Sequence, residues 1–226
     1  MKKNGFTLAE VLITLTIIGV IATMTLPALM TNTQEQQAKT ALKKGINTLT
    51  EAAQLSQAID GISYADLTVG AVTSSDIVAQ PSLYALLVNR TQYDPSKSGT
   101  SRLGIGEGAA AKNTANYALF FRDGTALSFP TALANNNTTS AIQSDGLPKG
   151  LSVVFDTNGL KGPNVISNCN KATLGTTSEP KDDGTVAGLN TKCSSDNRVI
   201  RDQFPVRLRA GFAVPNSPAA RWAFEN

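Results

Sequence analysis

The sequence predicts an α+β fold, with one long N-terminal helix whose second half packs on a C-terminal antiparallel β-sheet. Three observations predict it. Residues 11–30 form an uncharged apolar run, and residues 33–59 continue with apolar positions spaced by three and four. The rest of the 226-residue chain alternates short apolar stretches with turn residues. The first two observations describe one helix of about 50 residues, and the third describes strands.

The apolar run at residues 11–30 is long enough to cross a membrane. About 20 helical residues span about 30 Å, the thickness of the hydrocarbon core of a bilayer. Its threonines are compatible with lipid because a helical Thr hydroxyl can donate to the carbonyl three or four residues earlier. Lys2 and Lys3 precede the run and predict a cytoplasmic N-terminus, which places the larger C-terminal part outside the cytoplasm.

Glu10 lies at the edge of this run, and a plain membrane anchor does not explain it. A carboxylate at this place costs on the order of 2 to 3 kcal/mol to insert, so we expect it to have a partner. Cleavage between Gly5 and Phe6 would create a positively charged amine four residues before Glu10. The carboxylate could then pair with this amine within one helix, or with the amine of a neighbouring copy.

The segment Gly5-Phe6-Thr7-Leu8-Ala9-Glu10, followed by an aliphatic run, resembles the leader junction of type IV prepilins and of the pseudopilins of type II secretion systems. The resemblance implies that a prepilin peptidase removes the leader after Gly5 and methylates Phe6. It also implies that Glu10, the fifth residue of the mature chain, acts in assembly. Gly19 and Pro27 fall where this family commonly has a helix-weakening glycine and a kinking proline.

The same resemblance implies an organisation and a location for the whole chain. The expected segments are a leader at 1–5, a membrane-spanning and filament-core helix at 6–30, its amphipathic continuation at 31–61 and a pilin-like periplasmic or extracellular domain at 62–226. The subunit would span the bacterial inner membrane once before it joins a periplasmic pseudopilus or a cell-surface pilus. Its expected partners are the lipid bilayer, the prepilin peptidase, the inner-membrane assembly platform, other pilins and copies of itself.

Other interpretations of the chain remain open. The N-terminus could be an ordinary signal anchor, or a secretory signal peptide cut near Val20-Ile21-Ala22. The length of the apolar run and the position of Glu10 favour the prepilin interpretation over both. A minor tip pilin or a membrane-anchored binding module, such as an adhesin or a receptor for DNA or polysaccharide, is the alternative function. Its ligand would be held by residues 62–116 or 169–193.

The long helix is expected to become amphipathic after residue 33 and to end before Gly61. Charged residues are expected mainly on the face opposite the apolar positions: Glu35, Lys39, Lys43, Lys44 and Glu51. Later stretches predict a short helix at 82–88, a loop at 94–99, a hairpin at 117–129, a strand at 151–155 and a last strand or hairpin at 204–215. Asp123-Gly124 suits a tight hairpin turn, and Pro130 ends the second strand of that hairpin.

Cys169 and Cys193 are the two cysteines of the chain. A pair on the non-cytoplasmic side of a membrane, in a chain that has no histidine, predicts a disulfide rather than a metal site. Closing a loop of this length would stabilise the fold by about 3 kcal/mol on the chain-entropy model. Two free thiols are the alternative.

Residues 156–164 follow a predicted strand and begin with Asp156, Asn158 and Gly159 at the spacing of a calcium loop. The further acidic ligands of such a loop are missing, so a double turn held by Asx hydrogen bonds is the favoured interpretation. Similar turns occur in pilin-like proteins, and some pseudopilins bind calcium in a C-terminal loop. That resemblance keeps Asp156 and Asn158 as calcium candidates, and no other cofactor is expected.

The composition argues against an enzyme and against nucleic acid as a partner. Without histidine there can be no Ser-His-Asp or Cys-His arrangement and no common zinc site. The glycine-rich residues 104–108 lack the context of a nucleotide loop and predict a flexible turn. The net charge is only +3, of which Lys2 and Lys3 supply two. The arginines near the C-terminus are expected on a solvated strand face, with an anionic partner as the alternative: Arg198, Arg201, Arg207, Arg209 and Arg221.

Overall fold

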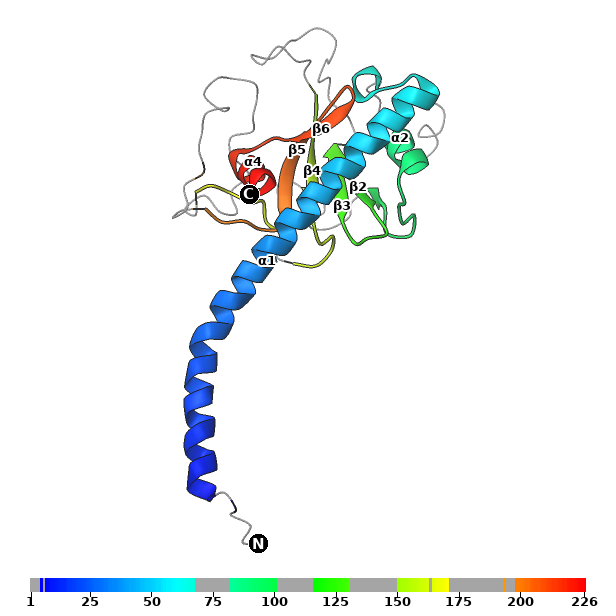
Figure 1. Ribbon diagram of the computed structural model, residues 1–226. Helices are drawn as coiled ribbons and strands as arrows, with labels where there is room; N and C mark the ends of the chain where they lie inside the picture. Colours follow the sequence, from blue (N-terminus) through cyan, green and yellow to red (C-terminus); the bar gives the residue numbers. More distant parts are fainter. Residues whose placement is uncertain are drawn as a thin grey trace. The chain divides into compact units, whose positions relative to one another are not determined.

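A computed structural model gives the structure of the protein (Figure 1). It describes residues 5, 7–67, 82–100, 116–130, 150–162, 164–170, 193 and 198–226. The chain forms two compact units, Met1–Gln37 and Ala38–Asn226. The turn expected at residues 104–108 lies outside the described residues.

Helix α1 (Leu8–Asp60) is the long helix that the sequence predicts. It ends at Gly61, whose φ of +68° lies in the left-handed region that glycine adopts without steric cost. Within the N-terminal unit, α1 contains an apolar run at residues 11–30, which makes the helix long and apolar enough to cross a membrane. Its threonines donate to carbonyls of their own helix, as with Thr14 to Val11 O at 3.0 Å. These threonine hydroxyls are therefore satisfied within the helix, as a lipid environment requires.

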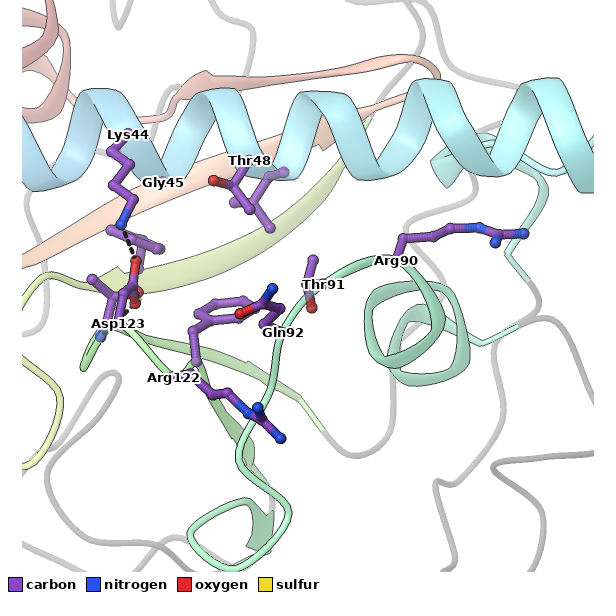
Figure 2. A pocket seen from close by; sticks show the side chains of 12 residues that line it. Lys44, Gly45, Thr48, Arg90, Thr91, Gln92, Arg122 and Asp123 are labelled. Atoms are coloured by element: carbon purple, nitrogen blue, oxygen red, sulfur yellow. Dashed lines mark hydrogen bonds and ion pairs between the residues drawn. The ribbon is translucent and has the colours of Figure 1, made fainter.

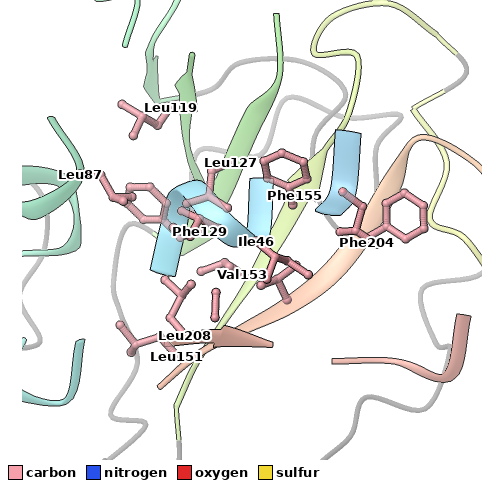
Figure 3. Packing of buried hydrophobic residues seen from close by; sticks show 14 of the residues in the cluster. Ile46, Leu87, Leu119, Leu127, Phe129, Leu151, Val153, Phe155, Phe204 and Leu208 are labelled. Atoms are coloured by element: carbon pink, nitrogen blue, oxygen red, sulfur yellow. The ribbon is translucent and has the colours of Figure 1, made fainter. Parts of the chain in front are cut away.

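From Ala38 onward, α1 buries one stripe of side chains against the sheet (Figure 1). The residues of this stripe are spaced mostly three or four positions apart and so share one face of the helix. They are Ala38, Leu42, Ile46, Leu49, Ala52, Ala53 and Ser56. Figure 3 shows Ile46 among Val153, Phe155 and Phe204. A Cβ built on Gly45 would overlap the ring of Phe155, so glycine is what lets this ring approach the helix backbone.

Lys39 corrects the expectation that the charged residues of α1 avoid the buried face. Lys39 is only 6% exposed, and its Nζ lies 3.9 Å from the centroid of the Trp222 ring. The guanidinium of Arg198 lies 3.4 Å from the same centroid. The face of an indole ring attracts cations, which explains why this buried position can hold a lysine.

The sheet of the C-terminal unit contains six described strands in the order β1-β2-β3-β4-β5-β6, each antiparallel to its neighbours. They are β1 (Gly99–Thr100), β2 (Asn116–Phe120), β3 (Ala126–Pro130), β4 (Leu151–Asp156), β5 (Gln203–Arg209) and β6 (Phe212–Pro215). The spatial order follows the chain order. This α+β layout, a long helix followed by an antiparallel sheet, confirms the predicted fold class.

Three short helices complete the described fold. They are η1 (Tyr64–Asp66), α2 (Leu83–Arg90) and α4 (Pro218–Glu225). Helix α2 was expected, and the Ser82 hydroxyl caps it by accepting from Ala85 N at 3.1 Å. Helix α4 was not predicted, although Ser217 followed by Pro218 is a capping signal and Ser217 does accept from Ala220 N at 3.1 Å.

The β2–β3 hairpin has a longer turn than the sequence suggested. Phe121 N donates to Thr125 O at 2.9 Å, and Gly124 N donates to Phe121 O at 3.1 Å, which leaves three residues in the loop. Gly124 has a φ of +91°, whereas Asp123 has no positive φ. The turn is thus a type I turn followed by a glycine bulge rather than a two-residue turn. The second hairpin, β5–β6, turns at Ala210-Gly211.

Strand β5 contradicts the expectation of a solvated arginine face. Arg207 and Arg209 are 8% and 7% exposed, and every residue of β5 is buried. The reason is that β5 is an internal strand between β4 and β6 and is covered on both faces. Both arginines interact with other groups of the protein, which is what buried guanidinium groups need.

Strand β6 is the last strand of the described sheet, and α1 covers part of its outer edge. Ala213 N donates to Thr50 Oγ1 at 3.1 Å, and the same hydroxyl donates to Ile46 O at 2.8 Å. Thr50 thus connects the edge strand to the backbone of α1. Pro215, two residues after Ala213, has no N–H to donate.

Candidate functional site

The start of α1 forms a hydrogen-bonded cap directly after the expected cleavage site. Glu10 Oε2 accepts from Thr7 N and from Thr7 Oγ1, both at 2.8 Å. Glu10 N in turn donates to Thr7 Oγ1 at 3.3 Å. This reciprocal arrangement is a capping box, in which the residue before the helix and its third residue satisfy each other's backbone N–H groups. The Glu10 carboxylate therefore has a partner inside its own chain.

A partner for Glu10 was predicted from the sequence, but Thr7 was not identified as that partner. The signal was available, because Thr-x-x-Glu before an apolar run is the pattern of a capping box. Gly5 is exposed, and no atom lies within 4 Å of the place where its Cβ would be. Phe6 lies outside the described residues. Helix α1 continues through Gly19 and Pro27.

The two cysteines form a disulfide, as their number and setting predicted. The Sγ atoms of Cys169 and Cys193 are 2.01 Å apart and their Cα atoms 5.0 Å. Asn168, beside the first cysteine, pairs with Val199 through backbone hydrogen bonds of 2.9 and 2.8 Å. Both ends of the disulfide loop are therefore attached to the C-terminal unit, Ala38–Asn226, which we call the sheet domain. Both half-cystines pack on its main hydrophobic cluster.

Asp156 and Asp202 organise the turn that follows β4. Asp156 Oδ1 accepts from Asn158 N at 3.0 Å and from Gly159 N at 2.8 Å, while Oδ2 accepts from Gln203 Nε2 at 2.9 Å. The Asp202 carboxylate accepts from the backbone N–H of Asn164 at 2.7 Å and of Val165 at 2.9 Å. These bonds form the Asx-type turn that the sequence favoured.

The surroundings of Asp156 change its acidity. Burial raises the pKa of Asp156 to about 7, and the nearby charge of Asp202 acts in the same direction. The hydrogen bonds from Asn158, Gln203 and Gly159 oppose this by stabilising the carboxylate. Among the described residues, no group of three or more His, Cys, Asp or Glu side chains is placed to hold a metal ion.

A cavity of about 290 Å³ lies in the sheet domain beside α1 (Figure 2). Leu49, Phe121 and Phe155 supply its apolar lining. Lys44 Nζ and Asp123 Oδ2, 2.8 Å apart, form an ion pair at its mouth. This ion pair joins α1 to the β2–β3 turn, as the dashed line in Figure 2 shows. This cavity was not predicted from the sequence, because its lining comes from segments far apart in the chain.

Comparison with known proteins identifies the N-terminal segment. Residues 1–26 match the family model of the prokaryotic N-terminal methylation motif. No curated protein and no solved structure matches the chain. The motif implies processing by a prepilin peptidase and assembly with other pilins, and it is typical of a structural protein rather than an enzyme. The chain thus carries, at the start of its long apolar helix, the N-terminal signal of type IV pilins and pseudopilins.

Proposed function

We propose that this protein is a structural subunit of a type IV pilus or of a type II secretion pseudopilus. The observation that supports this most is the methylation motif at residues 1–26, which ends within a helix able to cross a membrane. In this proposal the peptidase cuts between Gly5 and Phe6 and methylates the new amine of Phe6. The subunit spans the inner membrane with its N-terminus in the cytoplasm. The assembly platform then moves it into the filament.

The capping box suggests how Glu10 serves both stages. Before assembly, Thr7 donates two hydrogen bonds to the Glu10 carboxylate, which reduces the cost of placing this charge at the membrane edge. A carboxylate has about four lone-pair sites, so it can accept from a second partner as well. In the filament that partner is the Phe6 amine of a neighbouring copy. A subunit in the wrong register would bury an unpaired charge, so the pairing selects the register.

The segments have separate roles in this proposal. Residues 1–5 are the leader, 6–30 form the filament core, 31–61 continue the helix, and 62–226 form the domain outside the membrane. Gly19 and Pro27 allow the core helix to adapt its path. The disulfide at Cys169 and Cys193 is on the oxidising side of the membrane, where such bonds persist.

The first test is the intact mass and N-terminal residue of the protein recovered from membranes or sheared filaments. A chain that starts at Phe6 and is heavier by one methyl group would support the proposal. A chain that keeps Met1 or starts near Thr23 would instead indicate an ordinary anchor or a secreted domain. The proposal would then be wrong.

Two substitutions separate the charge of Glu10 from its capping role. Glu10→Gln keeps a side chain able to accept from Thr7, whereas Glu10→Leu removes both the charge and the cap. We expect both variants to insert into the membrane and both to give far fewer filaments than the wild type. Immunoblots of membrane and sheared-filament fractions measure this. Normal filament yield from Glu10→Gln would show that the charge is not needed for assembly.

A further inference from the structure

The cavity beside α1 combines an apolar floor with polar side chains around it (Figure 2). Leu49, Phe121 and Phe155 form the floor. Thr48 and Gln92 also line the cavity, and their side chains make no hydrogen bond with any residue that the structure describes. Sites for small molecules are concave, mostly apolar and equipped with a few polar groups that orient the ligand. The volume of about 290 Å³ lies at the small end of their range.

The charges of the lining leave one cation over. Lys44 is paired with Asp123, and Arg90 is paired with Asp60. Arg122, the third cation, is exposed and makes no ion pair or side-chain hydrogen bond within the described part of the chain. One guanidinium without a counter-ion favours a ligand with a single negative charge, because a second charge would stay unpaired beside an apolar wall.

The backbone fixes Arg122 at the mouth of the cavity. Its N–H donates to Gln92 O at 3.0 Å, and Tyr93 and Phe121 form a β-bridge next to this bond. The two segments that carry Gln92 and Arg122 therefore lie side by side. An exposed arginine keeps its rotamer freedom, so its guanidinium can turn over the mouth when an anion is there. A carboxylate matches this planar group best, because it accepts two parallel hydrogen bonds from it.

We propose that the cavity binds a small, free carboxylate with a compact apolar body, such as an arylacetate. The apolar body lies against Phe121 and Phe155, and the carboxylate pairs with Arg122. The Gln92 amide supplies a further donor beside it. This site goes beyond the proposed function, because its lining lies wholly within the sheet domain and includes neither the membrane-spanning run nor a second subunit.

Fluorine NMR of 4-fluorophenylacetate measures the binding, with the full chain in lipid nanodiscs and empty nanodiscs as the background. We expect a dissociation constant on the order of 0.1 to 1 mM, which suits a ligand of about ten non-hydrogen atoms. 4-Fluorophenylacetamide has nearly the same shape without the charge and should bind about tenfold more weakly. Acetate has the charge without the apolar body and should not displace the probe at an equal concentration.

Three variants locate the binding. Arg122→Gln removes the guanidinium and should raise the dissociation constant by about tenfold or more. Thr48→Met fills the hollow from α1 and should weaken binding at least as much while the sheet domain still unfolds cooperatively. Lys161→Gln is the matched control, because this lysine is exposed and does not line the cavity. It should leave the dissociation constant unchanged.

Protection from alkylation provides a second readout that depends on place. Gln92→Cys puts a thiol in the lining, and the two natural cysteines are joined to each other and do not react. A saturating concentration of 4-fluorophenylacetate should slow the reaction of this thiol with iodoacetamide by at least about threefold. Gln54→Cys is the control, since position 54 is exposed on α1 and outside the lining. Its rate should not change.

The outcomes are distinct. Weaker binding by Arg122→Gln, unchanged binding by Lys161→Gln and protection at position 92 alone support the proposal. It is overturned by undetectable binding of the acid, by equal affinities for acid and amide, or by equal affinities of Arg122→Gln and the wild type.

A peptide that ends in phenylalanine with a free carboxyl group is the last arm of the experiment. If it binds at least about tenfold more tightly than 4-fluorophenylacetate, the cavity receives chain ends and the assignment to a free small molecule is wrong. Weaker or equal binding of the peptide supports the small molecule. None of these measurements uses processing or filament yield, so their failure would leave the proposed function untouched.

Discussion

The two parts of helix α1 differ in how they satisfy their polar groups. In the N-terminal unit, Thr16 and Thr25 donate to carbonyls of the same helix at 2.8 and 3.0 Å. In the sheet domain, the Thr50 hydroxyl also donates to its own helix, but it accepts from Ala213 of β6 as well. In the first part, the threonine hydroxyls bond only within the helix, whereas in the second part a threonine hydroxyl also bonds to the sheet.

The apolar side chains of the two parts differ in the same way. Leu15 is 61% exposed and Leu42 is completely buried, although both are leucines of one helix. The surface around Leu15 is suited to lipid or to other helices, whereas the surface around Leu42 is already covered by the sheet. Apolar residues in a helix therefore do not by themselves indicate a buried core. Whether they stabilise the fold depends on whether the sheet or the surrounding lipid covers them.

The largest expected effect comes from removing one leucine from each part. Leu42→Ala should lower the free energy of unfolding of the sheet domain by about 2 to 5 kcal/mol, because it leaves a cavity in the core. Leu15→Ala should change it by less than about 0.5 kcal/mol. Denaturation of the full chain in detergent, followed by the fluorescence of Trp222, measures both. Similar losses for the two variants would mean that the two parts of α1 do not differ in this way.

The second effect concerns the buried charge of the sheet domain. The pKa of Asp156 is raised to about 7 in the folded protein from an ordinary value near 3.8. The folded state therefore binds the proton more tightly than the unfolded state, and its stabilising contribution is complete below about pH 4 and lost as the pH rises through 7. Between these limits we expect a fall on the order of a few kcal/mol.

Asp156→Asn tests the origin of this pH dependence. The amide oxygen can still accept from Asn158 N and Gly159 N, but the side chain no longer titrates. The unfolding free energy of this variant, measured between pH 4 and 8, should depend less on pH than that of the wild type. The same slope in both proteins would show that another group causes it.

The third effect compares two glycines. Gly45→Ala puts a methyl group where the Phe155 ring lies, so we expect a loss of about 1 to 3 kcal/mol despite the better helix propensity of alanine. Gly19→Ala meets no atom within 4 Å in the same chain and should leave the unfolding of the sheet domain unchanged. Thermal unfolding of the two variants gives the comparison. An unchanged midpoint for Gly45→Ala would mean that Phe155 can move aside freely.

The smallest effect is expected at the Lys44–Asp123 ion pair. The two side chains are 62% and 33% exposed, so solvent weakens their attraction. Lys44→Ala should cost less than about 1 kcal/mol, and the difference from the wild type should shrink at high salt. Urea titrations at two salt concentrations measure it. A larger, salt-independent loss would show that the aliphatic part of Lys44 matters for packing rather than its charge.

Much of the fold could be predicted from the sequence because its signals are local. The period of α1, Gly61 at its end, Asp123-Gly124 in the first hairpin and the single pair of cysteines each lie within a short stretch or depend on a count. The N-terminal methylation motif could be recognised for the same reason, since it lies within the first 26 residues. The capping partner Thr7 could be predicted too, because Thr-x-x-Glu before an apolar run is a local pattern.

The parts that could not be predicted depend on contacts between distant segments. Asp156 and Gln203 are 47 positions apart, and Thr50 and Ala213 are 163 positions apart. No local pattern reveals that Arg207 lies on an internal strand covered on both faces, or that Lys39 lies under an indole. These features arise from sheet order and from the place of α4, which alternation and turn residues do not determine.

The covered edge of β6 has a consequence for how another chain could add to this sheet. An exposed strand edge is a template onto which another chain can add a strand. At β6, the outward N–H of Ala213 is bonded to Thr50 and Pro215 has none to offer, so an incoming strand would find no donor at either place. The edge therefore offers few of the N–H donors that backbone pairing of the amyloid or donor-strand type would use. In the proposed filament, contacts that involve this edge would therefore be made mainly by side chains.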